Sequence, residues 1–395
     1  MTVLAACVAL FAAIQLGWAL RISSAVPTVD ALDAPAPARW PTVAVVVPAR
    51  DEAAGIEAAL TSKLACGYPA LELVAVDDRS RDATGAILDR LAATDPRLRV
   101  THVRALPDGW LGKLHAMAQG VAVATGEWVL FSDADVHLAP GTLERLIAHA
   151  EAHRVDGLAV MPRFDPVSPV LDSAMAGAVR ALCLLGRLWV ANDDRAPTAM
   201  GVGAFNLVRR RWLEDTDALH ALRMEVVDDV ALMALLKARG ARTRVFAGRA
   251  RVHLVFMGSV RAMAASTAKA GGTFGFGLGL AVLGAAAPLV VDLALPLAAV
   301  LHGGVAAALG GLALLTTTAT HLVLCVHFAA PLRGALLWPL ATPLLGALTL
   351  RAGVRAWREQ GVWWRETFYP RAALEAGRRL DVRTLRLVEP PTPPG

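Results

Sequence analysis

Apolar and polar positions follow two patterns along this chain, and the first alternates short apolar runs with stretches of helical period. The apolar runs are TVAVVVPA (42–49), LELVAVDD (71–78), LRVTHV (98–103) and GEWVLFSDAD (126–135). The stretches of helical period lie at residues 52–64, 82–93, 112–124 and 141–152. Continuous β-branched runs separated by helices predict an α/β domain whose mostly parallel sheet is covered by helices on both faces.

The second pattern is a long apolar block. Between Gly271 and Leu350, only Asp292 and Arg333 carry a formal charge. A membrane-spanning helix needs about 20 apolar residues, so this block predicts about three spans. They would lie at residues 276–301, 304–328 and 334–352. Residues 1–20 form a further apolar run, and we interpret it as an uncleaved anchor because no basic residue precedes it, unlike in a signal peptide.

These patterns divide the chain into four parts. They are an anchor at 1–21, an α/β domain at 40–255, a membrane domain at 271–353 and a basic tail at 354–395. Four spans around a cytoplasmic α/β domain would put this Arg-rich tail outside the cell, against the usual preference of basic flanking segments for the cytoplasm. Either the segment 334–352 is re-entrant, or the first apolar run does not span the membrane.

The composition restricts the class of protein. Hydrophobic residues make up 55% of the chain and charged residues 18%, which is too apolar for an ordinary soluble protein. The net charge is +5, but Lys and Arg form neither a recognition helix nor a zinc-finger pattern, so no nucleic-acid partner is expected. The four Cys are scattered without a CxxC motif, which argues against a disulfide framework or a zinc site.

Pairs of acids follow three of the four apolar runs. The first run leads to Asp51 and Glu52; the other pairs are Asp77 with Asp78, and Asp133 with Asp135. Ligands bind outside the carboxyl ends of the strands in an open parallel sheet, so these side chains should converge on one crevice. Crowded carboxylates repel one another, and a divalent cation relieves that conflict. Oxygen ligands of this kind suit Mg²⁺ or Mn²⁺.

Two common nucleotide-binding motifs are missing from the chain. No G-x-G-x-x-G follows the first run, and no G-x-x-x-x-G-K-[ST] occurs. A dinucleotide-dependent redox enzyme and a P-loop ATPase are therefore disfavoured. A nucleotide held by carboxylates, through its base N–H and ribose hydroxyls, remains open.

Taken together, the motifs resemble those of family 2 glycosyltransferases of GT-A fold. The matching segments are VVVPARDE, VAVDDRSRDAT, GWLGKLHAMAQG, GEWVLFSDADVHLAPGTLERL and VVDDVALMALLKARG, in the family's order within residues 40–250. The apolar layout is similar to that of bacterial integral-membrane members, including the hopanoid-associated and carotenoid-type enzymes that act on lipids. The resemblance implies a GT-A, Rossmann-like α/β catalytic domain joined to transmembrane helices.

The resemblance also implies roles for particular residues. Asp229 matches the catalytic base, and Asp228 stands where the family usually has Glu. The nucleotide-sugar would be bound by Glu52 near the ribose, Asp78 at the uracil N–H with Asp77 beside it, Lys113 near the diphosphate, and Asp133. The metal would be held by Asp135, with Asp133 contacting the ribose or the metal. The donor or acceptor would be bordered by Gly203 in MGVGAFN and by Trp364 and Arg365 in GVWWRETFYP.

The predicted reaction is inverting transfer of a sugar from a nucleotide donor, expected to be a UDP-sugar, to a lipid hydroxyl. The enzyme would lie in the inner (plasma) membrane as a multi-pass protein with a cytoplasmic catalytic domain. The chain lacks the Gln-x-x-Arg-Trp motif of processive members, which argues against a polymer synthase. Two alternatives stay open: transfer to polyprenyl phosphate, and a membrane scaffold or transporter without catalysis.

Overall fold

A computed structural model describes residues 1–270, 278–381 and 384–388. The chain divides into two compact units. The helical unit comprises residues 1–26, 164–189 and 256–375, and the sheet unit comprises residues 27–163, 190–255 and 376–395. Residues 164–189 thus belong with the apolar helices, and the end of the basic tail belongs with the sheet. The sequence pattern indicated neither assignment.

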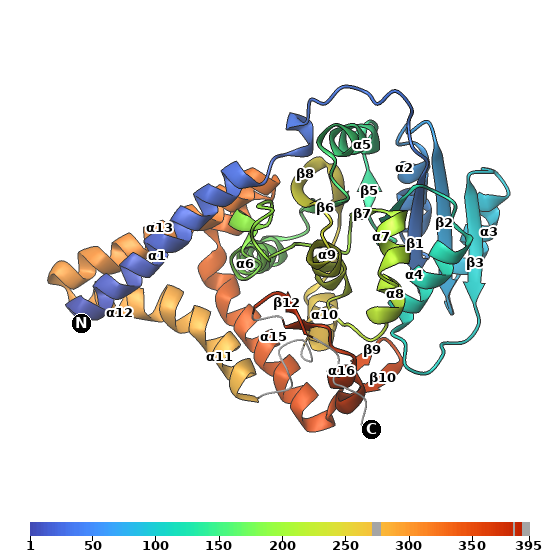
Figure 1. Ribbon diagram of the computed structural model, residues 1–395. Helices are drawn as coiled ribbons and strands as arrows, with labels where there is room; N and C mark the ends of the chain where they lie inside the picture. Colours follow the sequence, from blue (N-terminus) through green and yellow to red (C-terminus); the bar gives the residue numbers. More distant parts are fainter. Residues whose placement is uncertain (271–277, 382–383, 389–395) are drawn as a thin grey trace. The chain divides into compact units, whose positions relative to one another are not determined.

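The sheet unit is built on an eight-stranded sheet of order β3-β2-β1-β4-β7-β6-β8-β5 (Figure 1). The strands are β1 (Val43–Ala49), β2 (Leu71–Asp78), β3 (Leu98–Val103), β4 (Trp128–Phe131), β5 (His137–Leu138), β6 (Gly157–Phe164), β7 (Asn206–Arg209) and β8 (Thr243–Leu254). The run β3-β2-β1-β4 is parallel, whereas β7 pairs antiparallel with both β4 and β6, and β5 pairs antiparallel with β8. The predicted α/β class and the four predicted strands are confirmed.

Burial on both faces explains the continuous apolar runs of the central strands. In β1, Val43 to Val47 are completely buried, and all four residues of β4 are buried. Val46 lies between Val74 of β2 and Phe131 of β4 in the register. A Cβ at Gly120 would overlap the Val46 side chain, so glycine lets the covering helix approach the sheet closely.

Helices of the sheet unit connect and cover the strands. They are η1 (Val29–Ala31), α2 (Ile56–Leu64), α3 (Thr84–Ala92), α4 (Gly112–Val123), α5 (Thr142–His153), α7 (Arg210–Asp215), α8 (Ala218–Ala221) and α9 (Asp228–Ala238). The short strands β11 (Leu380–Asp381) and β12 (Arg386–Leu387) pair as a separate antiparallel ladder. The helices α2 to α5 occupy the stretches predicted from helical period.

The helical unit consists mainly of long apolar helices. Its elements are α1 (Thr2–Ala25), α6 (Pro169–Leu185), α10 (Val260–Ala270), α11 (Leu278–Pro288), the π-helix η3 (Leu289–Ala294), α12 (Leu295–His302), α13 (Gly304–Phe328), α14 (Leu332–Leu336), α15 (Trp338–Glu359), β9 (Gly361–Trp364) and β10 (Thr367–Pro370). The short segments η2 (Leu188–Val190) and α16 (Arg371–Gly377) run across the unit boundaries. In the described residues, three helices are long and apolar enough to cross a membrane: Thr2–Ala25, Leu278–His302 and Gly304–Phe328.

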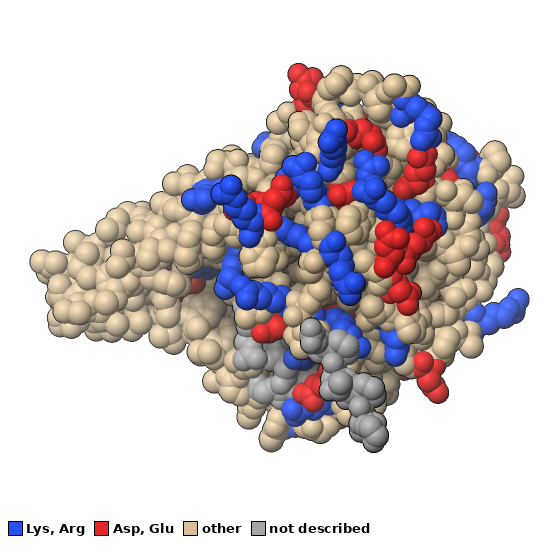
Figure 2. Space-filling view, in the orientation of Figure 1, with Lys and Arg blue, Asp and Glu red and all other residues tan. Residues whose placement is uncertain are grey.

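Small residues let these three helices pack closely. Val8, Ala9 and Ala12 of α1 form a buried cluster with Ala313 of α13. A Cβ at Gly310 would overlap the Pro296 carbonyl, so α12 and α13 approach at backbone distance there. On the face drawn in Figure 2, the surface over α1, α12 and α13 carries almost no charged side chains.

The segment 334–352 differs from the expected third span of the C-terminal block. It is divided between α14 and α15, and α15 is not among the three described helices that meet the length and apolarity of a span. The reason lies in the second half of α15, which carries Arg351, Arg355 and Arg358. The start of the span predicted at 276–301 falls partly on residues 271–277, which lie outside the described residues.

A buried polar network joins three helices of this unit. Arg180 of α6 pairs with Asp292 of η3 at 2.8 Å, and its other terminal nitrogen donates to Gln15 of α1. Gln15 and Asp292 are both buried. A charged pair with an added amide acceptor satisfies groups that would be costly alone in apolar surroundings. The Asp292 carboxylate therefore has a structural partner in Arg180.

Candidate active site

The loops after β1 and β2 are joined by hydrogen bonds. The Asp51 carboxylate accepts from the Arg81 amide at 2.8 Å, and the Glu52 amide donates to the Thr84 hydroxyl at 2.8 Å. Asp51 itself has a φ of 54°, an uncommon conformation for a non-glycine residue. These bonds hold the Glu52 backbone at the carboxyl end of β1, where the sequence predicted a ribose contact.

The two acids at the end of β2 have different surroundings. Asp77 accepts from the Ser80 amide at 3.1 Å and contacts the His102 ring at 2.9 Å. The hydrogen bonds of His102 to Asp77 and to Asp89 raise the pKa of this histidine. Asp78 is buried, and both of its oxygens accept from Arg79, at 2.8 and 3.1 Å. Asp77 thus holds neighbouring strands together, while Asp78 faces the loop that carries Gly112.

Gly112 brings the GWLGK segment against Asp78. A Cβ at this position would lie 2.7 Å from Asp78 Oδ2 and 2.9 Å from Arg79 Nη2. The glycine is therefore required by a close approach between the start of α4 and the end of β2. This approach places Lys113, the next residue, over the ends of the central strands.

The SDAD loop after β4 rests on a buried lysine. Lys63 of α2 is completely buried, and its ammonium donates to the carbonyls of Val136 and Asp133. Burial lowers the pKa of Lys63 to about 7. Burial and the nearby carboxylates of Asp133 and Glu52 raise the pKa of Asp135 to about 6. The loop therefore holds a carboxylate whose ionised form is disfavoured until a cation approaches.

Lys113 lies among three carboxylates. Its ammonium is 3.0 Å from Asp133 Oδ1 and 3.6 Å from Asp228 Oδ2. Burial lowers the pKa of Lys113, but Asp133, Asp228 and Asp229 raise it by more, so the lysine stays charged. These acids come from the loop after β4 and from α9, which are far apart in the sequence. The structure thus gathers one cation and three acids at the carboxyl ends of the strands.

Asp229 is fixed by two backbone amides. Its Oδ2 accepts from the Gly203 amide at 2.8 Å, and its Oδ1 accepts from its neighbour Val230 at 2.8 Å. Burial raises the pKa of Asp229, and Lys113 and the amides offset only part of that effect. A Cβ at Gly203 would lie 3.2 Å from both Asp133 Oδ2 and Lys113 Nζ. Gly203 thus brings a backbone donor into the centre of the cluster.

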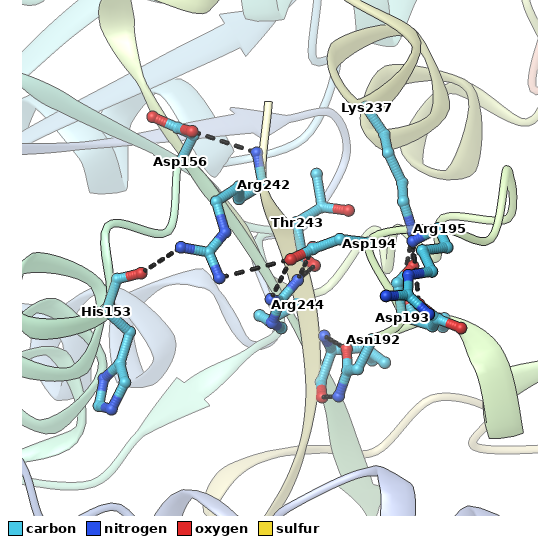
Figure 3. A network of polar contacts seen from close by, with 12 residues as sticks. His153, Asp156, Asn192, Asp193, Asp194, Arg195, Lys237, Arg242, Thr243 and Arg244 are labelled. Carbon is cyan, nitrogen blue, oxygen red and sulfur yellow. Dashed lines mark hydrogen bonds and ion pairs between the residues drawn. The ribbon is translucent and has the colours of Figure 1, made fainter. Parts of the chain in front are cut away.

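A second polar network fastens the loop that precedes Gly203. Lys237, near the end of α9, donates to the carbonyls of Ala191, Asp193 and Thr198 at 2.8 to 3.2 Å (Figure 3). Asn192 exchanges two hydrogen bonds with the backbone of Val245. Two contacts therefore hold this loop to α9. Lys237 binds it at the C-terminal end of the helix, and Asp229 binds the Gly203 amide at the N-terminal end.

The structure brings together most of the residues singled out from the sequence. Lys113, Asp133, Asp228, Asp229 and Gly203 form one cluster. Asp135 lies on the same loop as Asp133, close enough to Glu52 for their charges to interact. In the helical unit, Trp364 ends β9 and Arg365 lies in the turn before β10. Their predicted place beside the substrate stays a prediction.

Sequence reasoning missed several supporting residues. Arg79, which binds Asp78, stands beside it in VDDRS and could have been found by that adjacency. Lys63 and Lys237 gave no signal, because a lysine in a helical stretch normally indicates a solvated position. Glu225 was also missed, although it is buried four residues before Asp229. Their roles depend on contacts between distant segments.

Asp133 and Asp135 are the residues that could hold a divalent ion. In the described ranges, no group of three or more His, Cys, Asp or Glu is arranged to hold a metal. Asp133 and Asp135 provide carboxylate oxygens on one loop, and the raised pKa of Asp135 reflects burial first and then the nearby negative charge. Ions such as Mg²⁺ are often bound by one or two carboxylates together with substrate phosphates. Asp133 and Asp135 therefore fit a divalent ion that would take further ligands from the diphosphate of a bound substrate.

Comparison with known proteins identifies the segment that carries Lys113, Asp133 and Gly203 of this cluster. Residues 44–216 match the model of "Glycosyl transferase family 2". Residues 44–216 form a family 2 glycosyltransferase domain. The resemblance seen in the sequence is thereby confirmed. The succinoglycan biosynthesis protein ExoO of Rhizobium meliloti (strain 1021) is 27% identical over 58% of this chain and 65% of its own length.

Two further similarities concern a lipid enzyme and the fold. The beta-monoglucosyldiacylglycerol synthase of Synechocystis sp. is 33% identical over 33% of this chain and 28% of its own length. The mannosyltransferase PcManGT of Pyrobaculum calidifontis, solved with GDP-Man and Mn²⁺, has 21% identity and a TM-score of 0.51, covering 90% of this chain and 99% of that one. This likeness supports the GT-A fold. The chain spans less than two thirds of the length of the curated relatives described here.

Proposed function

We propose that this protein is an inverting glycosyltransferase that moves a sugar from a nucleotide donor to a lipid hydroxyl. The observation that carries the proposal is the position of Asp229. This half-buried carboxylate has a raised pKa, is oriented by the Gly203 amide and lies beside the Lys113 ammonium. A base of raised pKa next to a fixed cation suits a reaction that removes a proton and releases a diphosphate.

The residues divide the chemistry between them. The acceptor oxygen forms a bond to the anomeric carbon as the bond from that carbon to the diphosphate oxygen breaks. Asp229 takes the acceptor proton, which is typically worth about 10²–10⁴ in rate. Lys113 stabilises the charge that develops on the departing diphosphate. Asp135 and Asp133 would hold a divalent ion, which would supply Lewis-acid neutralisation of the same charge.

The donor is proposed to be a nucleotide-sugar, with a UDP-sugar as the first choice. The PcManGT structure contains GDP-Man, so guanosine donors belong in the same test. Both oxygens of Asp78 accept from Arg79, so a base N–H would share this carboxylate with the guanidinium. Glu52 and Asp77 are proposed to line the same nucleotide site, with Asp77 acting through its bonds to the backbone.

A lipid acceptor is supported by two observations. Three of the described helices are apolar enough to cross a membrane, and a relative is named a beta-monoglucosyldiacylglycerol synthase. A hydroxyl acceptor needs a base, whereas the phosphate of a polyprenyl phosphate is already ionised. The carboxylate of Asp229, whose pKa is raised, therefore favours the hydroxyl. Trp364 and Arg365 are proposed to border the acceptor.

We propose a multi-pass protein of the inner (plasma) membrane with the sheet unit in the cytoplasm. Three crossings, by Thr2–Ala25, Leu278–His302 and Gly304–Phe328, return the chain to the cytoplasm before α15. The Arg-rich segment from Arg351 onward then lies inside, in agreement with the positive-inside tendency. Residues 376–388 belong to the sheet unit, which supports the same side for the tail and the catalytic domain.

The proposed function can be tested with purified protein in lipid nanodiscs. Labelled UDP- and GDP-sugars are incubated with Mn²⁺ or Mg²⁺ and bacterial lipid extract, and the labelled lipid is identified. We expect a glycolipid, and we expect Asp229→Asn to reduce its formation by about 10²–10⁴. Full activity of Asp229→Asn would favour a phosphate acceptor. Absence of both turnover and nucleotide binding would favour a scaffold.

A further inference from the structure

The end of the basic tail is folded onto the sheet unit. β11 and β12 pair through Leu380 with Leu387 and Asp381 with Arg386, and Leu380 is completely buried. The strand β12 contacts α9, the helix that begins with the Asp228–Asp229 pair (Figure 1). The tail therefore packs directly on the element that carries the proposed base.

Close packing at one glycine strengthens this contact. A Cβ at Gly377 would overlap the Met224 side chain, so the chain entering the tail passes in direct contact with the segment before α9. Met224 is itself buried. Two separate points of contact, Gly377 and β12, thus hold the tail against both the approach to α9 and the helix itself.

Glu225 connects the tail to the start of α9. Its side chain is buried, and its carboxylate accepts three backbone amides. Oε1 accepts from Val227 at 3.1 Å, while Oε2 accepts from Arg379 at 2.7 Å and Leu380 at 3.0 Å. Hydrogen bonds from N–H groups to an ionised carboxylate are among the stronger ones in proteins, and a buried charge without them is costly.

The position of Val227 makes this arrangement relevant to catalysis. Val227 precedes α9 directly, and Asp228 and Asp229 are the first two residues of that helix. Without the tail, Glu225 would keep one of its three amide donors and would turn toward water to recover the others. The turn at residues 225–227 would then lose its anchor, and Asp229 would shift relative to Lys113.

We propose that residues 376–381 and 384–388 form a working part of the active site, in which Glu225 is a positioning residue that sets Asp229 for proton transfer. The inference rests on the proposed function and adds an element that the family match at residues 44–216 does not include. The tail acts on the rate of the chemical step. The donor contacts on β1 and β2 do not depend on it.

The test compares two perturbations with two controls in nanodiscs. The perturbations are a chain that ends at Glu375 and the substitution Glu225→Gln. The glutamine has one oxygen that can accept hydrogen bonds, and its NH₂ group would face backbone N–H donors where the second carboxylate oxygen now accepts. The controls are a chain that ends at Val388, which keeps every contact described above, and Glu214→Gln, an exposed acid paired with Arg210. The kcat and KM for the donor are measured with amide hydrogen exchange across residues 225–230.

Both perturbations are expected to lower kcat by about ten- to a hundredfold, since a displacement of about 1 Å can cost that much, while the donor KM stays unchanged. Exchange at residues 226–230 should rise, and a peptide of residues 376–388 added in trans should restore part of the kcat. A folded chain ending at Glu375 with full kcat and unchanged exchange would overturn the inference. Hydrogen exchange tests the tail contact even if the proposed transfer fails.

Discussion

Replacing Asp135 with Asn tests the electrostatic account of the SDAD loop. The pKa of Asp135 rises from its ordinary 3.8 to about 6, first because of burial and then because of Asp133 and Glu52. A difference of about two pH units corresponds to about 3 kcal/mol. The carboxyl is partly accessible to solvent, which screens such effects, so this figure is an upper bound.

The raised pKa of Asp135 determines whether a higher pH stabilises or destabilises the fold. The folded protein holds this proton more tightly than the unfolded chain, so ionisation of Asp135 destabilises the fold as the pH rises from about 4 to above 6. Without metal at pH 8, Asp135→Asn should therefore be more stable than the native protein, by up to about 3 kcal/mol. At about 2–4 °C per kcal/mol, the unfolding midpoint should rise by up to about 10 °C. Near pH 4 the difference should vanish.

The assay is thermal unfolding in nanodiscs, with EDTA or with Mn²⁺ and a nucleoside diphosphate. Mn²⁺ with the nucleotide should stabilise the native protein, because binding to the folded state alone raises its stability. It should leave Asp135→Asn unaffected. A variant that is less stable than the native protein in EDTA at pH 8 would refute the electrostatic reasoning. Equal stabilisation of both proteins by Mn²⁺ would refute the metal assignment.

Three further predictions concern the cluster and the topology. Lys113→Met should lower kcat by about 10²–10³, measured as initial rates, because it removes the cation beside the departing diphosphate; an unchanged rate would exclude that role. Gly201→Ala should prevent folding, since its Cβ would overlap the Asp229 carbonyl. Gly203→Ala should fold and lose activity, because its Cβ would lie 3.2 Å from Asp133 Oδ2 and Lys113 Nζ. Circular dichroism reports the folding of each variant, and transfer assays report its activity. In a variant without other cysteines, Val388→Cys should react with an impermeant maleimide only in inside-out vesicles, and labelling of intact cells would contradict the proposed topology.

Part of the active site could be read from the sequence because it depends on strand ends. Asp78, Asp133 and Asp135 each follow or end an apolar run, and the carboxyl ends of β1, β2 and β4 share one edge of the parallel half of the sheet. The antiparallel half could not be read in the same way. β7 inserts between β4 and β6, and no local signal in Asn206–Arg209 specifies its neighbours.

The apolar helices show the same division between what the sequence predicts and what the fold decides. The low charge of residues 278–328 was enough to predict two helices long enough to span a membrane, because helix length and apolarity are local properties. The pairing of Arg180 with Asp292 was not predictable, since it depends on how α6 packs against η3 within the helical unit. The sequence predicts only a basic tail at 354–395. The contact of this tail with Glu225 depends on the folded chain.

The sequence alone determined the α/β class, the apolar helices and the acids at the strand ends, because hydrophobic period and local spacing encode each of them. Tertiary structure decided which of these groups meet. Lys113, Asp133, Asp228 and the Gly203 amide lie on separate segments, as do Glu225 and the amides of Arg379 and Leu380. Such contacts arise when buried charges and amides must find partners after the strands have packed, and no local pattern records that requirement.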